Sequence, residues 1–547
     1  MLLDKPTTES VAAMTDHAAQ SSNRFLYLAV FTSGMTTLAV ELSASRLLGN
    51  VFGTSNIVWA NVIGLILLYL TIGYFIGGRW ADRSPHFTTF YRILLWGAFL
   101  SALIPLVARP VLTTAATAMA NVEAALALGS FVSVLVLFSI PVTLLGCVSP
   151  FAIRLAVQNI NDAGKISGRI YAISTLGSLL GTFAPVLFFI PEIGTIRTFL
   201  LFAGVLYIVG FVGLWRETGK SSVKWLWMPV VIGVLTLLVL NGPLRAPFTG
   251  ATLLYDDESA YNYIQVQEDA AGNRYLYLNE GQGIHSQWNK DNYADNHRTW
   301  SFFLTAPYFN APPFQPNDVH SIAIIGLAAG TIARQYTKVY SDIPIDGIEL
   351  DPGIVEAGAK YFDMNAAMMP NLKVYVQDGR YELNQLDKQY SVIAVDAYRP
   401  PYIPWHLTTV EFFQEVRRHL TDDGVVAINV GRTNTDRRLV DAMTSTLLQV
   451  FPSVHAMDVP YSFNTILVGT VQPTSGDNLS SNLSALPQDA DPLLRDALTW
   501  GVTQSVPIHE SDLIFTDDRA PVETLADSLV INFLLSGETD KLGKQGE

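Results

Sequence analysis

The fold of this chain is decided by residues 321–351, which read SIAIIGLAAGTIARQYTKVYSDIPIDGIELD. An apolar run of strand length at 322–325 leads into a glycine turn at 326–330, and a segment with helical character follows. A second apolar run, 345–350, closes the stretch with an acid at its tip. The order strand, glycine turn, helix and strand predicts the βαβ unit of a nucleoside-binding α/β fold.

Four residues of this unit are candidate nucleoside ligands: Gly326, Gly330, Glu349 and Asp351. Glycines let the backbone turn tightly and approach a ligand closely. The pattern is G-x-A-x-G, so Ala328 stands where a middle glycine is common. A carboxylate about 20 residues after the turn is placed to accept the hydroxyl pair of a ribose.

Acids also follow the next two predicted strands, at 373–376 and 391–395. The first strand is followed by Asp378 and Gly379, and the second by Asp396. In open α/β sheets, ligands bind at the edge where the carboxyl ends of the strands meet. We therefore predict Asp378 and Gly379 as further nucleoside contacts and Asp396 as part of the same site.

The composition divides the chain into two dissimilar halves. Of its 547 residues, 50% are hydrophobic and 15% are charged. Up to Leu244 there are 14 basic and 9 acidic residues, a net of +5, and from Arg245 onward there are 20 and 39, a net of −19. An acidic domain argues against a nucleic-acid partner and can attract a cationic substrate. The single cysteine, Cys147, excludes an intrachain disulfide and a cysteine-based metal site.

The first half predicts a transmembrane domain at 25–241, preceded by a disordered tail at 1–24. A crossing helix needs about 20 apolar residues. The Ala-rich segment 111–127 is either interfacial or a poor eighth span. The stretches that qualify as spans are seven: 25–48, 57–78, 93–108, 128–148, 171–190, 197–215 and 225–241.

The predicted spans make this chain a multi-pass protein of the cell membrane. Its basic residues indicate the topology. They cluster in three loops, around Arg83, Lys165 and Lys220. The positive-inside rule places these loops and the N-terminus in the cytoplasm. Seven crossings would put the acidic half outside. An eighth crossing, or a seventh segment that only dips into the bilayer, would put it inside. The sequence leaves the side open, and we favour the cytoplasm because nucleoside cofactors are made there.

Glu41 and Arg46 lie within the first predicted span. Ionisable groups inside a membrane are costly and often functional. They predict a membrane polar site for an amine or a proton. The alternative is a helix-end pair in which Arg46 extends to the interface.

A linker at 242–258 contains two prolines and two glycines and separates the halves. A small β domain at 259–310 follows, because 261–267 alternates with period two and 274–278 returns after a turn, as in a hairpin. The next residues, 279–286, predict a loop that lines a cleft.

The rest of the soluble half predicts a doubly wound, Rossmann-like sheet at 311–535, with a C-terminal tail at 536–547. The helix predicted at 409–420 and the strand at 425–430 complete this sheet. The predicted fold class is therefore a multi-span helical membrane domain followed by a β hairpin segment and an α/β domain.

Residues 259–470 resemble spermidine synthase, a polyamine aminopropyltransferase. Residues 259–266, SAYNYIQV, are similar to the family's opening S-x-Y-Q-x-I, and the glycine turn takes the place of G-G-G-D-G. The resemblance implies a small β domain followed by a methyltransferase-type sheet. It also implies that Glu349 holds the ribose, Asp378 the adenine and Asp396 the amine end of decarboxylated S-adenosylmethionine.

Motifs in both halves resemble the fused, membrane-bound spermidine synthase-like proteins. Soluble relatives imply a homo-oligomer, which the membrane half leaves open. The motifs that carry the resemblance are Glu41 with Arg46, GGRWADR at 77–83, GRIY at 168–171, IPWHLTTVEFF at 403–413 and TDDRAPVE at 516–523.

One departure from the family concerns the general base. The family carries D-S-S-D or D-T-S-D after the fourth strand, whereas this chain has Asp396-Ala-Tyr-Arg399, with Arg at the base position. An amine with a pKa of about 10.4 is unprotonated in roughly one molecule per thousand at neutral pH. A general base contributes about 10² to 10⁴ in rate. The substitution therefore predicts a slow enzyme or a different acceptor, and Arg399 would repel a diamine.

Other side chains are candidates to compensate for the lost base. His285 and His406 are alternative bases. A compensating carboxylate could come from Asp396, Glu280, Asp295 or the pair Asp517 and Asp518. The family's Tyr-His/Gln-Glu acceptor motif is matched at best by Tyr-Ala-Asp at 293–295. The candidate substrate-binding residues are Tyr261, Glu280, Asp295 and Tyr398.

The leading hypothesis is a membrane-anchored aminopropyltransferase of polyamine biosynthesis that acts on a small amine. The reaction would be direct displacement at the carbon beside a sulfonium, which needs no metal because the leaving group is already activated. One alternative is methyl transfer from S-adenosylmethionine to a lipid or an amine. Another is a transporter or sensor that binds a polyamine or nucleoside without chemistry.

Overall fold

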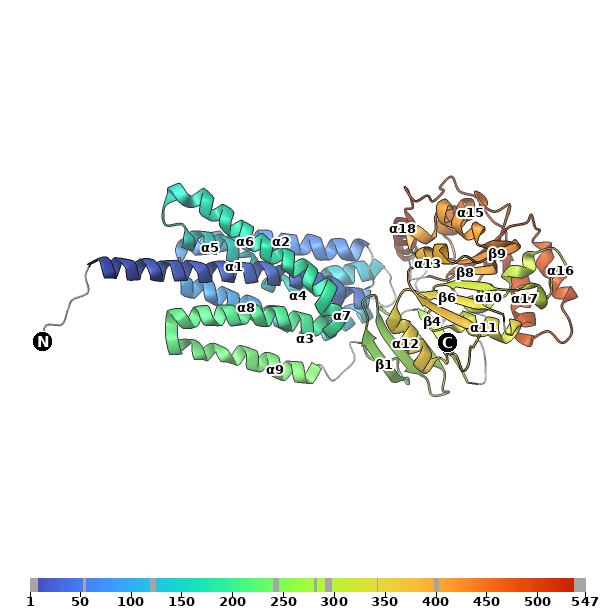
Figure 1. Ribbon diagram of the computed structural model, residues 1–547, viewed down its shortest axis with the longest axis horizontal. Helices are drawn as coiled ribbons and strands as arrows, with labels where there is room; N and C mark the ends of the chain where they lie inside the picture. Colours follow the sequence, from blue (N-terminus) through green and yellow to red (C-terminus); the bar gives the residue numbers. More distant parts are fainter. Residues whose placement is uncertain are drawn as a thin grey trace. The chain divides into compact units, whose positions relative to one another are not determined.

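The computed structural model describes residues 8–52, 56–118, 124–239, 245–279, 283–290, 298–341, 343–397 and 403–535. The chain divides into two compact units, a helical one that ends at Ala246 and an α/β one that begins at Pro247 (Figure 1). The predicted order, helices first and an α/β sheet second, is confirmed.

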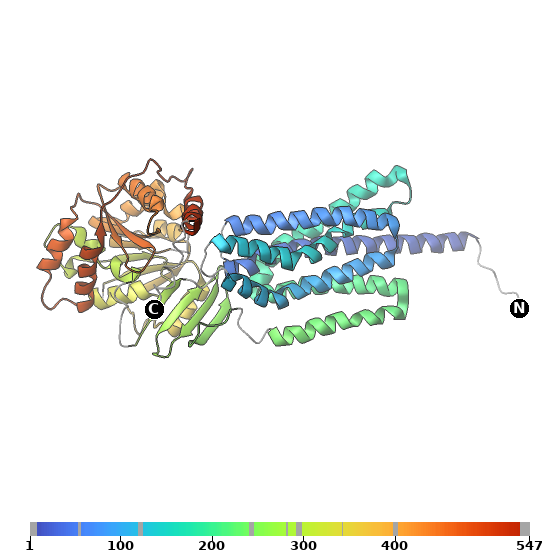
Figure 2. The ribbon, with the colours of Figure 1, turned by 180° about the vertical axis from the view of Figure 1, so that it is seen from behind.

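Long helices that run alongside one another form the first unit, as Figures 1 and 2 show. Five stretches are long and apolar enough to cross a membrane: Arg24–Phe52, Asn56–Arg83, Phe87–Ala108, Gly129–Ala156 and Ile160–Leu238. The last of these contains the predicted spans 171–190 and 197–215 and most of 225–241. The helices of at least eight residues are α1 (Thr8–Phe52), α2 (Asn56–Arg83), α3 (Phe87–Ala118), α4 (Ala124–Gly146), α5 (Val148–Ala156), α6 (Ala163–Ala184), α8 (Thr195–Thr218) and α9 (Trp227–Val239).

The start of α1 differs from the prediction. The helix begins at Thr8, although we expected residues 1–24 to be a disordered tail. Residues 8–24 contain four alanines and neither proline nor glycine. Alanine has the highest helix propensity, so the helix of the first apolar span can continue outward into this segment.

Glycines allow α1 and α6 to pack with their backbones in contact. A Cβ atom on Gly177 would lie 2.0 Å from the carbonyl oxygen of Phe31, and one on Gly181 would lie 2.0 Å from that of Met35. The same helical unit exposes large apolar side chains, among them Phe75, which is 66% exposed. Small residues between helices and apolar residues outside them are typical of helices in lipid.

A four-stranded antiparallel sheet opens the α/β unit, with strand order β1-β2-β3-β4. The predicted hairpin is confirmed as β2 (Tyr263–Glu268) paired with β3 (Arg274–Leu278). Two boundaries were wrong. β1 (Thr252–Glu258) occupies the predicted linker, because an edge strand tolerates its acidic residues. β4 (Ile284–Trp288) occupies the end of the predicted loop, where it pairs with β3.

The large sheet has eight strands in the order β12-β10-β11-β9-β8-β5-β6-β7. The strands β5 to β9 run parallel to one another, whereas β11 is antiparallel to both β9 and β10. The doubly wound sheet is confirmed, and the antiparallel extension was not predicted. The strands are β5 (Ile322–Ile325), β6 (Ile345–Glu349), β7 (Leu372–Val376), β8 (Tyr390–Val395), β9 (Leu420–Gly431), β10 (Ser453–Asp458), β11 (Asn464–Thr470) and β12 (Ser505–Val506).

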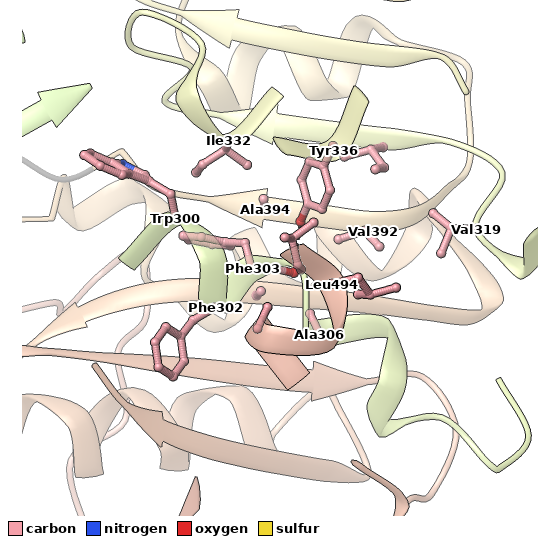
Figure 3. Close-up of a cluster of buried hydrophobic side chains, with 14 of the residues drawn as sticks. Trp300, Phe302, Phe303, Ala306, Val319, Ile332, Tyr336, Val392, Ala394 and Leu494 are labelled. Carbon is pink, nitrogen blue, oxygen red and sulfur yellow. Dashed lines mark hydrogen bonds between the residues drawn. The ribbon is translucent and has the colours of Figure 1, made fainter. Parts of the chain in front are cut away.

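Helices cover both faces of this sheet, because successive residues of each buried strand point to opposite sides. On β5, Ile322 and Ile324 pack into one core, and Ala323 and Ile325 pack into the other. Figure 3 shows the first core, where Tyr336 lies near Phe303. The main helices are α10 (Thr299–Phe303), α11 (Thr331–Tyr340), α12 (Pro352–Tyr361), α13 (Gly379–Gln385), α14 (Val410–Arg418), α15 (Arg438–Leu448), α16 (Asp477–Ala485), α17 (Pro492–Gln504) and α18 (Val522–Leu535).

Candidate active site

The strand order brings the predicted acids to one edge of the large sheet. β5 lies between β8 and β6, so the glycine turn that follows β5 is flanked by Asp396 after β8 and by Glu349 at the end of β6. Asp378 follows β7, one strand further out. The sheet thus places Asp396 and Asp378 on opposite sides of the turn.

The glycine turn needs glycine at both of its ends. Gly326 and Gly330 both have a φ of 85°, a left-handed conformation that side chains disfavour. A Cβ atom on Gly326 would lie 2.5 Å from the backbone nitrogen of Ala397. The turn therefore passes directly against the chain that carries Asp396. Ala328 has a φ of 49°, so the position where a middle glycine is common keeps the left-handed conformation without one.

Glu349 lies beneath the glycine turn and is 8% exposed. Its two carboxylate oxygens accept hydrogen bonds from the backbone N–H groups of Ala328, at 2.9 Å, and Asp351, at 3.0 Å. Burial raises the pKa of Glu349 to about 7. The carboxylate is therefore held in one orientation, as a preorganised binding group requires.

Asp351 has a structural role in place of the predicted nucleoside contact. One carboxylate oxygen accepts the backbone N–H of Gly353 and caps α12. The other accepts the hydroxyl of Ser259 at 2.6 Å and the side-chain amide of Asn262 at 2.7 Å. Since Asp351 is fully buried and both oxygens have protein partners, it fixes the small sheet to the large one.

Asp378 is paired with His406. One oxygen of Asp378 accepts the backbone N–H groups of Arg380 and Tyr381 at the start of α13. The other lies 3.0 Å from Nε2 of His406, and this hydrogen bond lowers the pKa of Asp378. A Cβ atom on Gly379 would lie 2.3 Å from the side chain of Ile325, so glycine lets α13 approach the sheet.

His406 is poorly placed to act as a base for an amine held by Asp396. It is bound to Asp378, which follows β7, whereas Asp396 follows β8. Three strand spacings separate β7 from β8, or about 14 Å. We conclude that His406 belongs to the side of the site formed by Asp378.

Asp396 forms the other side of the site, together with two asparagines that we did not predict. One oxygen of Asp396 accepts the side-chain amide of Asn429 at 2.9 Å, and Asn464 donates to the oxygen of Asn429 at 2.9 Å. Burial raises the pKa of Asp396 to about 7. Asn429 lies near the carboxyl end of β9, and Asn464 lies at the start of β11. The rule that ligands bind at the carboxyl ends of strands would therefore also have identified Asn429.

The remaining soluble candidates lie around this edge or outside the described residues. His285 lies at a β-bulge in β4, beside Ser286, whose hydroxyl accepts the backbone N–H of Ala329 in the glycine turn. A bulge next to a site commonly re-aims a side chain. Tyr261 is 39% exposed, in the turn before β2. Glu280, Asp295, Tyr398 and Arg399 lie outside the described residues.

The two membrane candidates belong to the other compact unit. Glu41 and Arg46 lie on α1 and are both half-buried, and their role stays a prediction. Within the described ranges, no group of three or more His, Cys, Asp and Glu side chains is arranged to hold a metal ion.

Comparison with known proteins finds a family match within the α/β unit. The model of the spermine/spermidine synthase domain matches residues 309–473. This region is similar to the spermine/spermidine synthase family. The matched region includes the glycine turn, Glu349, Asp378 and Asp396, so it contains the site built above.

Individual relatives cover only part of the chain. A probable polyamine aminopropyl transferase of Bifidobacterium longum is 30% identical over 304 residues, which cover 51% of this chain and 65% of that protein. An eEF1A lysine and N-terminal methyltransferase of Xenopus laevis is 26% identical over 166 residues, which cover 28% of this chain and 23% of that protein. A probable spermidine synthase structure from Corynebacterium glutamicum is 21% identical and covers 49% of this chain and 99% of its own, with a TM-score of 0.37.

Proposed function

We propose that this chain is a membrane-anchored transferase that moves an aminopropyl group from decarboxylated S-adenosylmethionine to an amine. The observation that carries the proposal is the position of Asp396, half-buried against the glycine turn of a spermidine synthase domain. The bacterial relative, named as a polyamine aminopropyl transferase, supports the substrate class. The five apolar helical stretches support membrane anchoring.

The donor fits the side of the site between the glycine turn and β7. Glu349 accepts the two ribose hydroxyls, and its backbone partners keep its oxygens in place. Asp378 lies at the far end, where the adenine amino group would donate to it. This arrangement leaves the sulfonium and the aminopropyl chain on the side of Asp396.

Transfer is a single displacement in this proposal. The amine nitrogen attacks the propyl carbon bonded to sulfur, so that an N–C bond forms and the C–S bond breaks. The electron pair of the broken bond stays on sulfur and gives methylthioadenosine. The amine proton passes to Asp396, whose pKa of about 7 lies near the operating pH, as an efficient general base requires.

Asp396 thereby replaces the base that the family resemblance places at Arg399. Its partner Asn429 donates to one oxygen, and the second oxygen can accept from the amine. A protonated amine and an ionised Asp396 attract each other, so the same group binds the acceptor and removes its proton.

The proposal is tested by incubating the purified full chain with decarboxylated S-adenosylmethionine and a mixture of amines. Mass spectrometry should find methylthioadenosine together with one aminopropylated amine. If the nucleoside binds and neither product forms, the proposal is wrong.

Methyl transfer from S-adenosylmethionine is the second candidate, because one relative is named as a methyltransferase. The glycine turn and Glu349 would bind that donor in the same way. A methyl-labelled donor separates the two reactions, since only methyl transfer leaves the label on the acceptor.

A further inference from the structure

Arg380 is the centre of a charged cluster beside the candidate active site. Its guanidinium donates to both carboxylate oxygens of Glu415, at 2.8 and 2.7 Å, and to both of Asp517, at 2.8 and 2.9 Å. It also donates to the carbonyl oxygen of His406 at 3.2 Å. The Arg380 side chain is only 18% exposed. Two-pronged pairs between arginine and carboxylate are strong and fix geometry.

Asp517 links this cluster to the C-terminal segment 516–523. The hydroxyl of Thr409 donates to Asp517 at 2.7 Å, and the backbone N–H of Asp517 donates to Glu411 at 3.0 Å. Thr516 and Arg519 exchange two backbone hydrogen bonds that close a turn around Asp517. The segment is therefore bound to the start of α14 and to Arg380 together.

The cluster surrounds the pair formed by Asp378 and His406. Arg380 is the second residue of α13, the helix that Asp378 caps, and it holds the backbone of His406 from the other side. Movement of Arg380 would therefore change the distance between Asp378 and His406, which is 3.0 Å. Asp517 is occupied by these contacts, so it does not supply the replacement carboxylate that we predicted.

We propose that residues 516–523 act as a strap that positions the Asp378–His406 side of the nucleoside site through Arg380. This inference rests on the proposed function, because it assumes that a nucleoside binds there. Arg380 and Asp517 are positioning residues, since neither is placed to touch the reacting atoms. The strap should affect donor binding and leave the chemical step at Asp396 unchanged.

The test compares Asp517→Asn with Asp518→Asn in the purified full chain. Both variants remove one negative charge, and Asp518 is exposed. Calorimetry with methylthioadenosine should give a dissociation constant about tenfold higher for Asp517→Asn, because its pair with Arg380 loses the charge of one partner. The value for Asp518→Asn should equal that of the wild type. Turnover at saturating donor should stay within about twofold of the wild type, and Asp517→Glu should restore binding.

A milder variant, Thr409→Val, removes one contact to Asp517 and should weaken nucleoside binding about twofold to threefold. It keeps the proposal testable if Asp517→Asn does not fold. If the wild type binds methylthioadenosine and both Asp517→Asn and Thr409→Val bind it equally well, the strap is overturned and the nucleoside site stands. A fall in saturated turnover as large as the fall in affinity would also overturn it. If the wild type binds no methylthioadenosine, the proposed function itself is wrong and the strap is overturned with it.

Discussion

Replacing Asp396 by asparagine should change both the rate and the pH dependence of transfer. In the wild type, ionised Asp396 and a protonated amine form the reactive complex. The value of kcat/KM should therefore fall about tenfold per pH unit below pH 7 and level off above it, because burial raises the pKa of Asp396 to about 7. Asparagine keeps the shape of the side chain and removes the base.

The variant must use amine that has already lost its proton to water. With an amine pKa of about 10.4, fewer than about one molecule in a thousand is in that form at pH 7. Activity should therefore fall by about 10² to 10⁴ at pH 7 and approach the wild-type value near pH 10. Initial rates of methylthioadenosine formation between pH 6 and pH 10 measure both quantities. A variant profile that still levels off near pH 7 would refute Asp396 as the base.

The stability of the same variant provides the folding control. The pKa of Asp396 is about 7 in the folded chain, and about 3.9 is expected for the unfolded chain. Between these values the folded chain binds more protons, so wild-type stability decreases as the pH rises through this window. Asparagine does not ionise, so the variant avoids this loss of stability. Because Asp396 is partly exposed, the expected increase in the free energy of unfolding is reduced to about 1–2 kcal/mol at pH 8, and no increase is expected at pH 3. Thermal melts at both pH values test this, and a destabilised variant at pH 8 would contradict it.

Three further predictions concern Asn429, Gly326 and, in the helical unit, Gly177. Asn429→Ala removes the hydrogen bond that lowers the pKa of Asp396, so the inflection of kcat/KM should move upward from pH 7; an unmoved inflection would contradict the contact. Gly326→Ala should abolish nucleoside binding in calorimetry, because the new Cβ would lie 2.5 Å from a backbone nitrogen, whereas Gly250→Ala, in open space, serves as a matched positive-φ control that should bind normally. Gly177→Leu should lower the melting temperature of the detergent-solubilised chain by separating α1 from α6, and an unchanged melt would show that this contact contributes little.

The sequence was sufficient for features that depend on local pattern. The glycine turn and the acids after β6, β7 and β8 follow from strand periodicity and from the rule that ligands bind at carboxyl ends of strands. The position of an acid at the end of a strand could not reveal which hydrogen-bond partners it has in the folded protein. Asp351 and Glu349 are two residues apart, yet one fastens the small sheet and the other remains at the glycine turn.

Features that depend on contacts distant in sequence were not predictable. The hydrogen bonds of Arg380 to Asp517 join residues 137 positions apart, and no local pattern encodes that pairing. The pairing of Asp378 with His406 likewise depends on where the chain after β8 returns to the sheet. The edge strand β1 was missed because its acidic sequence does not predict a strand. It is stabilised by its pairing with β2.

The most direct test of the account is the stoichiometry of products at pH 7. Wild-type protein with decarboxylated S-adenosylmethionine and its preferred amine should form methylthioadenosine and aminopropylated amine in equal amounts, and Asp396→Asn should form neither at a comparable rate. Equal rates in the two proteins, or methylthioadenosine without an aminopropylated product, would contradict the account.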